Sequence, residues 1–301
     1  MGLRTQPEPA RLPLPGGSEG ATVRVRPLLT GEALMPPGFF ERPGGPLGYV
    51  RGLGLTTPKS RWTWIPVPAF LVEHPSAGPI LIDTGLDASV AEDPARNLGR
   101  RHKLTFKERM ETGQAVPAQL EALGIAPGDV RLVVMSHLHY DHASGIGQFP
   151  DATFVVTRAE WEWAAGHGFF KGYRHQLFDT GGDWRLVDFD APEAESHATF
   201  GRTLDLLGDG SVRLVSTPGH TMGHQSVLLR LGGGRELLVV ADAADTQRHL
   251  DDDLDTLFRD DEHLYFRSQH EIRRYAESTP DAVVIPGHDP GLWPRLDAVY
   301  E

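Results

Sequence analysis

The stretch from Ser136 to His142 constrains the fold of this chain more than any other part of the sequence. It reads S-H-L-H-Y-D-H, so four side chains that can bind a metal fall within six residues. The apolar run Arg131 to Met135 directly before it predicts a buried strand, and the small residues after it predict a turn into a helix. Side chains at such a strand end are held rigidly and face a cleft, so the stretch predicts a metal centre.

Local geometry divides these four side chains into two pairs. Residues two apart on an extended chain point the same way, so His137 and His139 can bind one ion. Asp141 and His142 lie beyond the turn, point elsewhere and can bind a second ion. Imidazole and carboxylate ligands together suit zinc and similar ions.

Three distant segments carry matching chemistry. Each places a ligand-type residue just past a strand-like run: Thr217 to His224 after Val212 to Ser216, Asp242 after Leu237 to Ala241, and Gly287 to Asp289 after Ala282 to Ile285. A solvated polar turn that happens to contain three histidines would not require these matches. The four segments together therefore favour a site for two metals.

At this point the sequence resembles a known family, the metallo-β-lactamase superfamily, and within it the N-acyl-homoserine lactone lactonases. The resemblance extends over about Ile65 to Asp289 and includes Gly78 to Gly85, Ser136 to His142, Thr217 to Ser226, Asp242–Ala243 and Gly287 to Asp289. Strand and helix periodicity alone indicates a mixed α and β sandwich. The resemblance implies an α+β fold with four layers, αββα, in which two mixed β-sheets lie between helices.

The resemblance also implies a ligand set. One metal is expected on His137, His139 and His220, the other on Asp141, His142 and His288, with Asp242 bridging both. Zinc is the expected metal, with iron, manganese or cobalt as alternatives. Asp83 is implied to orient the stretch from Ser136 to His142, called the metal loop below, through hydrogen bonds. His224 is implied to lie behind the ligands and is left out of the set.

The implied reaction opens the ester ring of a lactone, with an N-acyl-homoserine lactone as the expected substrate, which would place the protein in quorum quenching. A hydroxide shared by two metals would attack the carbonyl, with Asp141 transferring the proton to the leaving alkoxide. Alternatives are a thioester or organophosphate hydrolase of the same fold and a metal-loaded protein without hydrolytic activity. The short segment after His288 leaves no room for the C-terminal helical region that thioester hydrolases of the fold carry.

One position departs from the lactonase pattern. Those enzymes usually carry a tyrosine three residues after the bridging aspartate, where it contacts the substrate carbonyl. Asp245 occupies this position here, and an ionised carboxylate donates no hydrogen bond. Lactone opening is then expected to be slower, to use another donor, or not to be the natural reaction.

Candidate substrate contacts come from two segments rich in aromatic residues. The Gly- and Pro-rich stretch from Gly31 to Leu53 is either an apolar wall over the cleft or a loop packed on the core or on a second subunit. In Gly166 to Gly182, Phe169 and Phe170 either line the substrate cleft or pack in the core. The candidates are Met35, Phe39, Phe40, Phe169 and Phe170, together with Asp245.

Composition limits the remaining classes. A net charge of -12 over 301 residues argues against a nucleic-acid partner, and the absence of cysteine excludes disulfides and thiolate ligands. No run approaches the ~20 apolar residues of a membrane span. Residues 1–20 mix proline with arginine and predict a flexible tail, so residues 21–301 are expected to form one hydrolase domain. We expect a cytoplasmic protein acting on a small molecule, with a homodimer as one allowed assembly.

Overall fold

The computed structural model describes residues 3–45, 47–55 and 57–301. The strands of its first sheet are β1 (Glu8–Pro9), β2 (Arg24–Met35), β3 (Thr63–His74), β4 (Gly78–Ile82), β5 (Glu108–Arg109), β6 (Leu132–Val134), β7 (Thr153–Thr157) and β8 (Asp183–Val187). Those of its second sheet are β9 (Glu195–His197), β10 (Phe200–Asp205), β11 (Val212–Ser216), β12 (Gln225–Arg230), β13 (Glu236–Ala241) and β14 (Val283–Pro286). The α-helices are α1 (Pro37–Phe40), α2 (Gly48–Gly52), α3 (Pro94–Asn97), α4 (Arg100–Thr105), α5 (Val116–Ala122), α6 (Tyr140–Ala143), α7 (Arg158–Gly166), α8 (His175–Phe178), α9 (Gln247–Asp252) and α10 (Glu262–Ser278).

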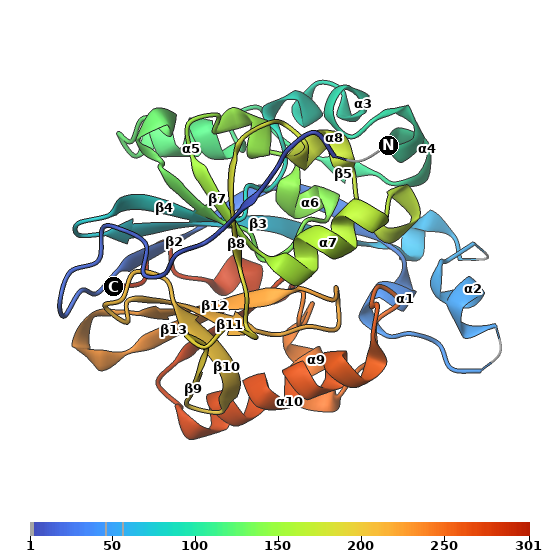
Figure 1. The fold of residues 1–301 in the computed structure, drawn as a ribbon. Helices are drawn as coiled ribbons and strands as arrows, with labels where there is room; N and C mark the ends of the chain where they lie inside the picture. The colour runs from blue at the N-terminus through green and yellow to red at the C-terminus, as the bar shows by residue number, and fades with distance from the viewer. Residues whose placement is uncertain (1–2, 46, 56) are drawn as a thin grey trace.

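The two sheets pack against each other, and helices cover their outer faces (Figure 1). Strand order is β1-β8-β7-β6-β4-β3-β2-β5 in the first sheet and β14-β13-β12-β11-β10-β9 in the second. Both sheets are mixed, since β4, β6, β7 and β8 run parallel and β13 pairs in parallel with β14, while hairpins such as β12–β13 are antiparallel. Helices α3 to α8 lie on the first sheet, and α9 and α10 lie on the second. This is the predicted four-layer arrangement.

The side chains of each inner strand alternate between two apolar layers. Leu71 of β3 contributes to the layer beneath the helices of the first sheet, whereas its neighbour Val72 contributes to the layer between the sheets. In β13, Val239 faces the layer between the sheets and Leu238 faces α10. Because both faces are buried, these strands read as continuous apolar runs in the sequence.

Several strands end at one edge of the sandwich, and the chain turns sharply there. Asp83 follows β4 with φ 58°, and Ala241 closes β13 with φ 49°. Left-handed backbone at a residue other than glycine is unfavourable and persists only where surrounding contacts enforce it. The two turns place the carboxylates of Asp83 and Asp242 in the seam, the line along which the two sheets meet at this edge.

The N-terminal segment differs from the predicted flexible tail. Within residues 3–20, β1 extends the first sheet by pairing in parallel with β8, and the segment crosses that strand (Figure 1). The backbone N–H groups of Arg4 and Thr5 donate to Asp179, and that of Ser18 donates to Asp209. The proline-rich segment therefore contains an edge strand. Proline has no N–H and is suited to an edge, where the outward side of the strand needs no donor.

The long stretch after β2 also differs in detail from a simple loop. Strand β2 continues to Met35, and the short helices α1 and α2 follow at the end of the sandwich where the seam opens. In the described part of the chain, no helix is both long and apolar enough to cross a membrane.

Removing residues 1–20 tests whether the docked segment stabilises the domain. Loss of β1 exposes the edge of β8 and the apolar contacts of Leu12 and Leu14 in the layer between the sheets. We expect the free energy of unfolding to fall by roughly 2–4 kcal/mol, measured by urea denaturation. The exposed Arg11 provides a control, since Arg11→Ala should leave stability unchanged. Equal stability of the shortened and full chains would contradict the assignment.

Candidate dinuclear metal centre

All seven predicted ligand residues converge at the strand-end edge of the sandwich. They form two groups, and within each group the candidate ligand atoms lie within 4.8 Å of one another. The groups are His137, His139, His220 and Asp242, and Asp141, His142 and His288. Apart from the half-buried His139, all are buried. They come from the loop after β6, from α6, and from the loops after β11, β13 and β14.

Asp242 lies between the groups and turns one oxygen to each. Its Oδ1 atom is 3.2 Å from His142 Nε2 and 3.1 Å from His288 Nε2. Its Oδ2 atom is 3.2 Å from His220 Nε2 and 3.8 Å from His137 Nε2. This geometry fits a carboxylate that bridges two cations.

The hydrogen bonds behind the histidines determine which nitrogen faces the centre. The Nδ1 atom of His288 donates to Pro66 O at 2.7 Å, and that of His142 donates to the Asp83 carboxylate at 2.8 Å. The Nδ1 atom of His137 donates to Ser136 Oγ at 3.0 Å, because that hydroxyl itself donates to Asp83. Each ring in its neutral form therefore directs a bare Nε2 lone pair into the site.

These inward atoms have no hydrogen-bond partner among the described residues, although they are buried. They include Nε2 of His137, His142 and His288 and Oδ1 of Asp242. Lone pairs of a neutral imidazole and a carboxylate repel each other at the 3.1–3.2 Å separations found here unless a cation lies between them. The residues thus fit the donor set of a pair of divalent metals.

The electrostatics of the groups agree with this fit. Burial alone would lower the pKa of His142, but the carboxylates of Asp242, Asp83 and Asp141 raise it well above its ordinary value. Burial is outweighed in the same way at His288, whose pKa rises to about 9 because of Asp242 and Asp141. The field at this site therefore favours positive charge.

The other group is more crowded with imidazoles. Burial, followed by the neighbouring histidines, lowers the pKa of His137 and His139 well below the ordinary value. Neutral imidazole is the form that binds a metal, so these two rings are prepared as ligands. At Asp242, burial opposes ionisation, but the surrounding histidines outweigh it and lower the pKa well below its ordinary value.

Asp83 holds the metal loop from the side of the first sheet. Its carboxylate accepts hydrogen bonds from Ser136 N and Ser136 Oγ, both at 2.7 Å, and from His142 Nδ1. It therefore connects the first and last residues of the S-H-L-H-Y-D-H stretch. This arrangement matches the orienting role that the resemblance implied for Asp83.

Glu160, on α7, holds the same loop from the other side. Its Oε1 atom accepts from Leu138 N at 2.9 Å and from the Tyr173 hydroxyl at 3.0 Å, and its Oε2 atom accepts from Thr221 Oγ1 at 2.6 Å. Leu138 lies between two candidate ligands, and Thr221 follows a third. Sequence reasoning missed Glu160, because Thr157-Arg-Ala-Glu160 resembles an ordinary helix-capping pattern and its partners are distant in the chain.

His224 is satisfied without a metal. Its Nδ1 atom contacts Thr217 Oγ1 and Thr217 O at 2.9 and 3.1 Å, and its Nε2 atom accepts from Asp242 N at 3.1 Å. Burial lowers its pKa to about 3. The ring supports the turn that presents Asp242, as expected for a residue behind the ligands.

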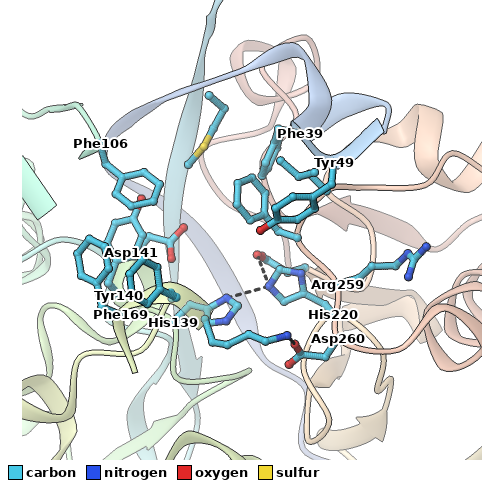
Figure 2. Close-up of a pocket in the computed structure, with 17 residues that line it drawn as sticks. Phe39, Tyr49, Phe106, His139, Tyr140, Asp141, Phe169, His220, Arg259 and Asp260 are labelled. Atoms are coloured by element: carbon cyan, nitrogen blue, oxygen red, sulfur yellow. Dashed lines mark hydrogen bonds and ion pairs between the residues drawn. The ribbon is translucent and has the colours of Figure 1, made fainter. Parts of the chain in front are cut away.

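An apolar cavity of about 170 Å³ opens beside the two groups. In Figure 2, Phe106, Tyr140 and Phe169 form one wall, Phe39 and Tyr49 form the other, and His139, Asp141 and His220 lie between them. The remaining lining residues are Met35, Phe170, Lys171, Gly172, Asp242, Leu257, Phe258, Arg259 and Asp260.

Two candidate substrate contacts are wrong. Asp245 is fully buried and lies outside the cavity lining, and its backbone carbonyl accepts from His288 N. Burial and the nearby Asp242 carboxylate raise the pKa of Asp245 well above its ordinary value. Phe40 packs edge-on against Phe39 and faces the core instead of the cavity. Met35, Phe39, Phe169 and Phe170 do line the cavity, so their contact with a substrate stays a prediction.

The sequence missed the rest of the lining. Tyr140 carried a signal, since it stands inside the S-H-L-H-Y-D-H stretch. Leu257 and Phe258 lie in the acidic segment between α9 and α10, where Asp260 pairs with Lys171 at 2.5 Å. Only the fold brings that segment to the cavity mouth.

The model of the metallo-beta-lactamase superfamily matches residues 62–288, which is most of the chain. This chain belongs to that superfamily. Among its relatives is the N-acyl homoserine lactonase AttM of Agrobacterium fabrum strain C58, 39% identical over 240 residues that cover 79% of this chain and 87% of that protein.

Solved structures agree at the level of the fold. An N-acyl homoserine lactone hydrolase with the product N-hexanoyl-L-homoserine at its catalytic metal centre gives a TM-score of 0.71 at 22% identity, covering 92% of this chain and 97% of that one. AidC, a dizinc quorum-quenching lactonase, gives a TM-score of 0.60 at 16% identity, covering 92% of this chain and 90% of that one.

Two substitutions distinguish the bridging position from a ligand of one group. Because Asp242 faces both groups, Asp242→Ala should reduce bound metal at both, whereas His288→Ala should lose mainly one ion per chain. Elemental analysis after dialysis measures this, with the exposed His263→Ala as a control. Retention of two ions by Asp242→Ala would contradict the bridge.

Glu160 provides a pH test of the loop anchor. Burial raises its pKa from an ordinary 4.5 to about 7, despite the hydrogen bonds from Thr221, Leu138 and Tyr173. Between these values the folded chain holds a proton that the unfolded chain has released, so stability falls as pH rises through this window. The total change is on the order of 3 kcal/mol.

Unfolding of the metal-free protein in urea at several pH values measures this change. Glu160→Gln does not titrate, so the stability of the wild type relative to this variant should decline between about pH 4.5 and 7 and then level off. A difference that does not vary with pH would show that Glu160 stays ionised throughout.

Proposed function

We propose that this protein is a metal-dependent hydrolase that opens the ester ring of N-acyl-homoserine lactones and thereby inactivates these signals. One observation carries the proposal. Two buried groups of ligand-type residues, joined by Asp242, form one end of a cavity whose walls are largely aromatic and aliphatic. Such a cavity fits a substrate with a reactive carbonyl at one end and an acyl chain at the other.

We further propose that His137, His139 and His220 hold one divalent metal, that Asp141, His142 and His288 hold the other, and that Asp242 bridges them. When bound, such a pair supplies a nucleophilic hydroxide at neutral pH and polarises a carbonyl. The dizinc relative and the imidazole-rich donor set support zinc.

Asp141 has the position required to move a proton. It lines the cavity, and its Oδ2 atom is 3.8 Å from His288 Nε2 and 4.0 Å from His142 Nε2. A carboxylate there can take a proton as the nucleophile attacks and return it to the ring oxygen that leaves as an alkoxide. The net reaction adds one water across the ester bond and gives the hydroxy acid.

The aromatic pairs of the cavity walls give an acyl chain an apolar surface to pack against. Phe39 and Phe258 lie 6.0 Å apart between ring centroids, and Phe106 and Phe169 lie 6.4 Å apart on the opposite wall. Walls that are mainly apolar favour acyl chains over peptide or sugar groups. The lactonase relatives support the same substrate class. A cytoplasmic location, a homodimer and the absence of a nucleic-acid partner remain predictions.

A substrate panel on metal-reconstituted protein tests the function. We expect hydrolysis of N-acyl-homoserine lactones to exceed that of a thioester and a phosphotriester. Because burial contributes about 0.8 kcal/mol per methylene, kcat/KM should rise up to about fourfold per added methylene until the cavity is full.

Variants at the wall and far from it sharpen the test. Phe39→Ala should flatten the dependence on chain length, whereas Leu123→Ala, on an exposed residue outside the cavity lining, should preserve it. Faster cleavage of the thioester or phosphotriester would reject the lactonase assignment and leave a two-metal hydrolase of another substrate class.

A further inference from the structure

The cavity offers few side chains that could donate a hydrogen bond to a substrate oxygen. Lys171 Nζ is held 2.5 Å from Asp260 Oδ1. Arg259 is held by Asp255 and Glu262, at 2.8 and 2.6 Å from its NH2 atom. The hydroxyl of Tyr140 is buried beneath the wall, although its ring lines the cavity. The two cations are therefore paired with carboxylates, and the Tyr140 hydroxyl is buried.

Tyr49 is the exception among the described lining residues. It lies on α2, its side chain borders the cavity, and its surface is about half exposed at 52%. Its hydroxyl has no hydrogen-bond partner among the described residues. In Figure 2 the Tyr49 ring lies beside Phe39 and its hydroxyl points to the floor of the cavity, the side on which His220 lies. A neutral phenol is free to donate one hydrogen bond there.

A close helix contact places Tyr49 in this position. A Cβ atom on Gly38 of α1 would lie 2.3 Å from Gly52 Cα, and one on Gly52 would lie 2.9 Å from a Leu257 methyl group. The two glycines therefore let α2 lie directly on α1 and beside the cavity mouth. Larger residues at either position would push α2, and Tyr49 with it, away from the floor.

We propose that Tyr49 donates a hydrogen bond to the carbonyl oxygen of the bound lactone and stabilises the negative charge that develops on it. The inference rests on the proposed function and adds a donor whose hydroxyl no other described residue occupies. Asp245 occupies the position at which the lactonases carry a tyrosine for this contact, but it is buried outside the cavity. A donor directed at the reacting carbonyl acts mainly on the transition state, because the oxygen is most negative there.

The test compares Tyr49→Phe with wild-type protein, both reconstituted with metal. Phenylalanine keeps the ring and removes only the hydroxyl, so bound metal should be unchanged. We expect kcat on an N-acyl-homoserine lactone to fall about tenfold or more, with a smaller rise in KM. Val50→Ala, an exposed neighbour on α2 outside the cavity lining, is the matched control and should behave like wild type. Gly38→Ala should reproduce the loss through displacement of α2.

Two further measurements identify the oxygen that Tyr49 contacts. The same fold-loss should occur on a simple γ-lactone that lacks the acyl amide, and a defect confined to the amide-bearing substrate would overturn the proposal. Titration calorimetry with an N-acyl-homoserine lactam, which keeps the carbonyl but resists hydrolysis, should show severalfold weaker binding to Tyr49→Phe than to Val50→Ala.

The outcomes separate this inference from the proposed function. Wild-type kcat and lactam affinity in Tyr49→Phe would reject the role of Tyr49 and leave lactone hydrolysis intact. Absence of lactone hydrolysis in the wild type, with another ester cleaved, would reject the substrate class.

Discussion

Two buried carboxylates hold the metal loop, and the geometry of the site depends on them. Asp83 bonds Ser136 and His142, at the two ends of the S-H-L-H-Y-D-H stretch, and Glu160 bonds the backbone of Leu138 near its centre. A loop fixed at three points cannot relax when four inward-facing ligand residues repel one another. The energy needed to gather unpaired nitrogen and oxygen atoms is thus supplied by hydrogen bonds outside the site.

The layered fold makes these anchors available. Asp83 comes from the end of β4, Glu160 from the first turn of α7, and the loop between them from the end of β6. Strands β4, β6 and β7 are adjacent and parallel, so their ends reach the same edge. The second sheet contributes its own strand ends, β11, β13 and β14, across the seam. A site built in this way draws on both sheets, and its rigidity follows from the packing between them.

The sequence predicted those residues of the site that stand in a recognisable local pattern. His137 to His142 can be recognised because a strand, a turn and a cluster of ligand types are contiguous, and the same holds for His220, Asp242 and His288. Glu160 and Tyr49 cannot be found this way, since their partners come from elements that only tertiary packing brings near. Asp245 failed for a related reason: its spacing from Asp242 was correct, but the turn after β13 directs it into the interior.

The strands divide in the same way into those that a local pattern predicts and those that depend on distant partners. Continuous apolar runs predicted β6 and β13, because strands buried on both faces need no alternation. The role of residues 3–20 could not be derived, because an edge strand of two residues leaves almost no pattern and depends on β8 far along the chain. The apolar residues of the segment near Leu257 were hidden among charges that pair with one another once folded.

The pairing of β1 with β8 has a consequence for how the chain is made. Glu8 pairs with Arg185, so β1 is synthesised well before the strand that it pairs with. An exposed, unpaired strand is a hazard for misassembly during that interval. Pro7, Pro9, Pro13 and Pro15 lack the N–H groups that a wrong partner strand would require. The prolines around β1 thus leave few N–H groups to which a wrong strand could pair before β8 is present.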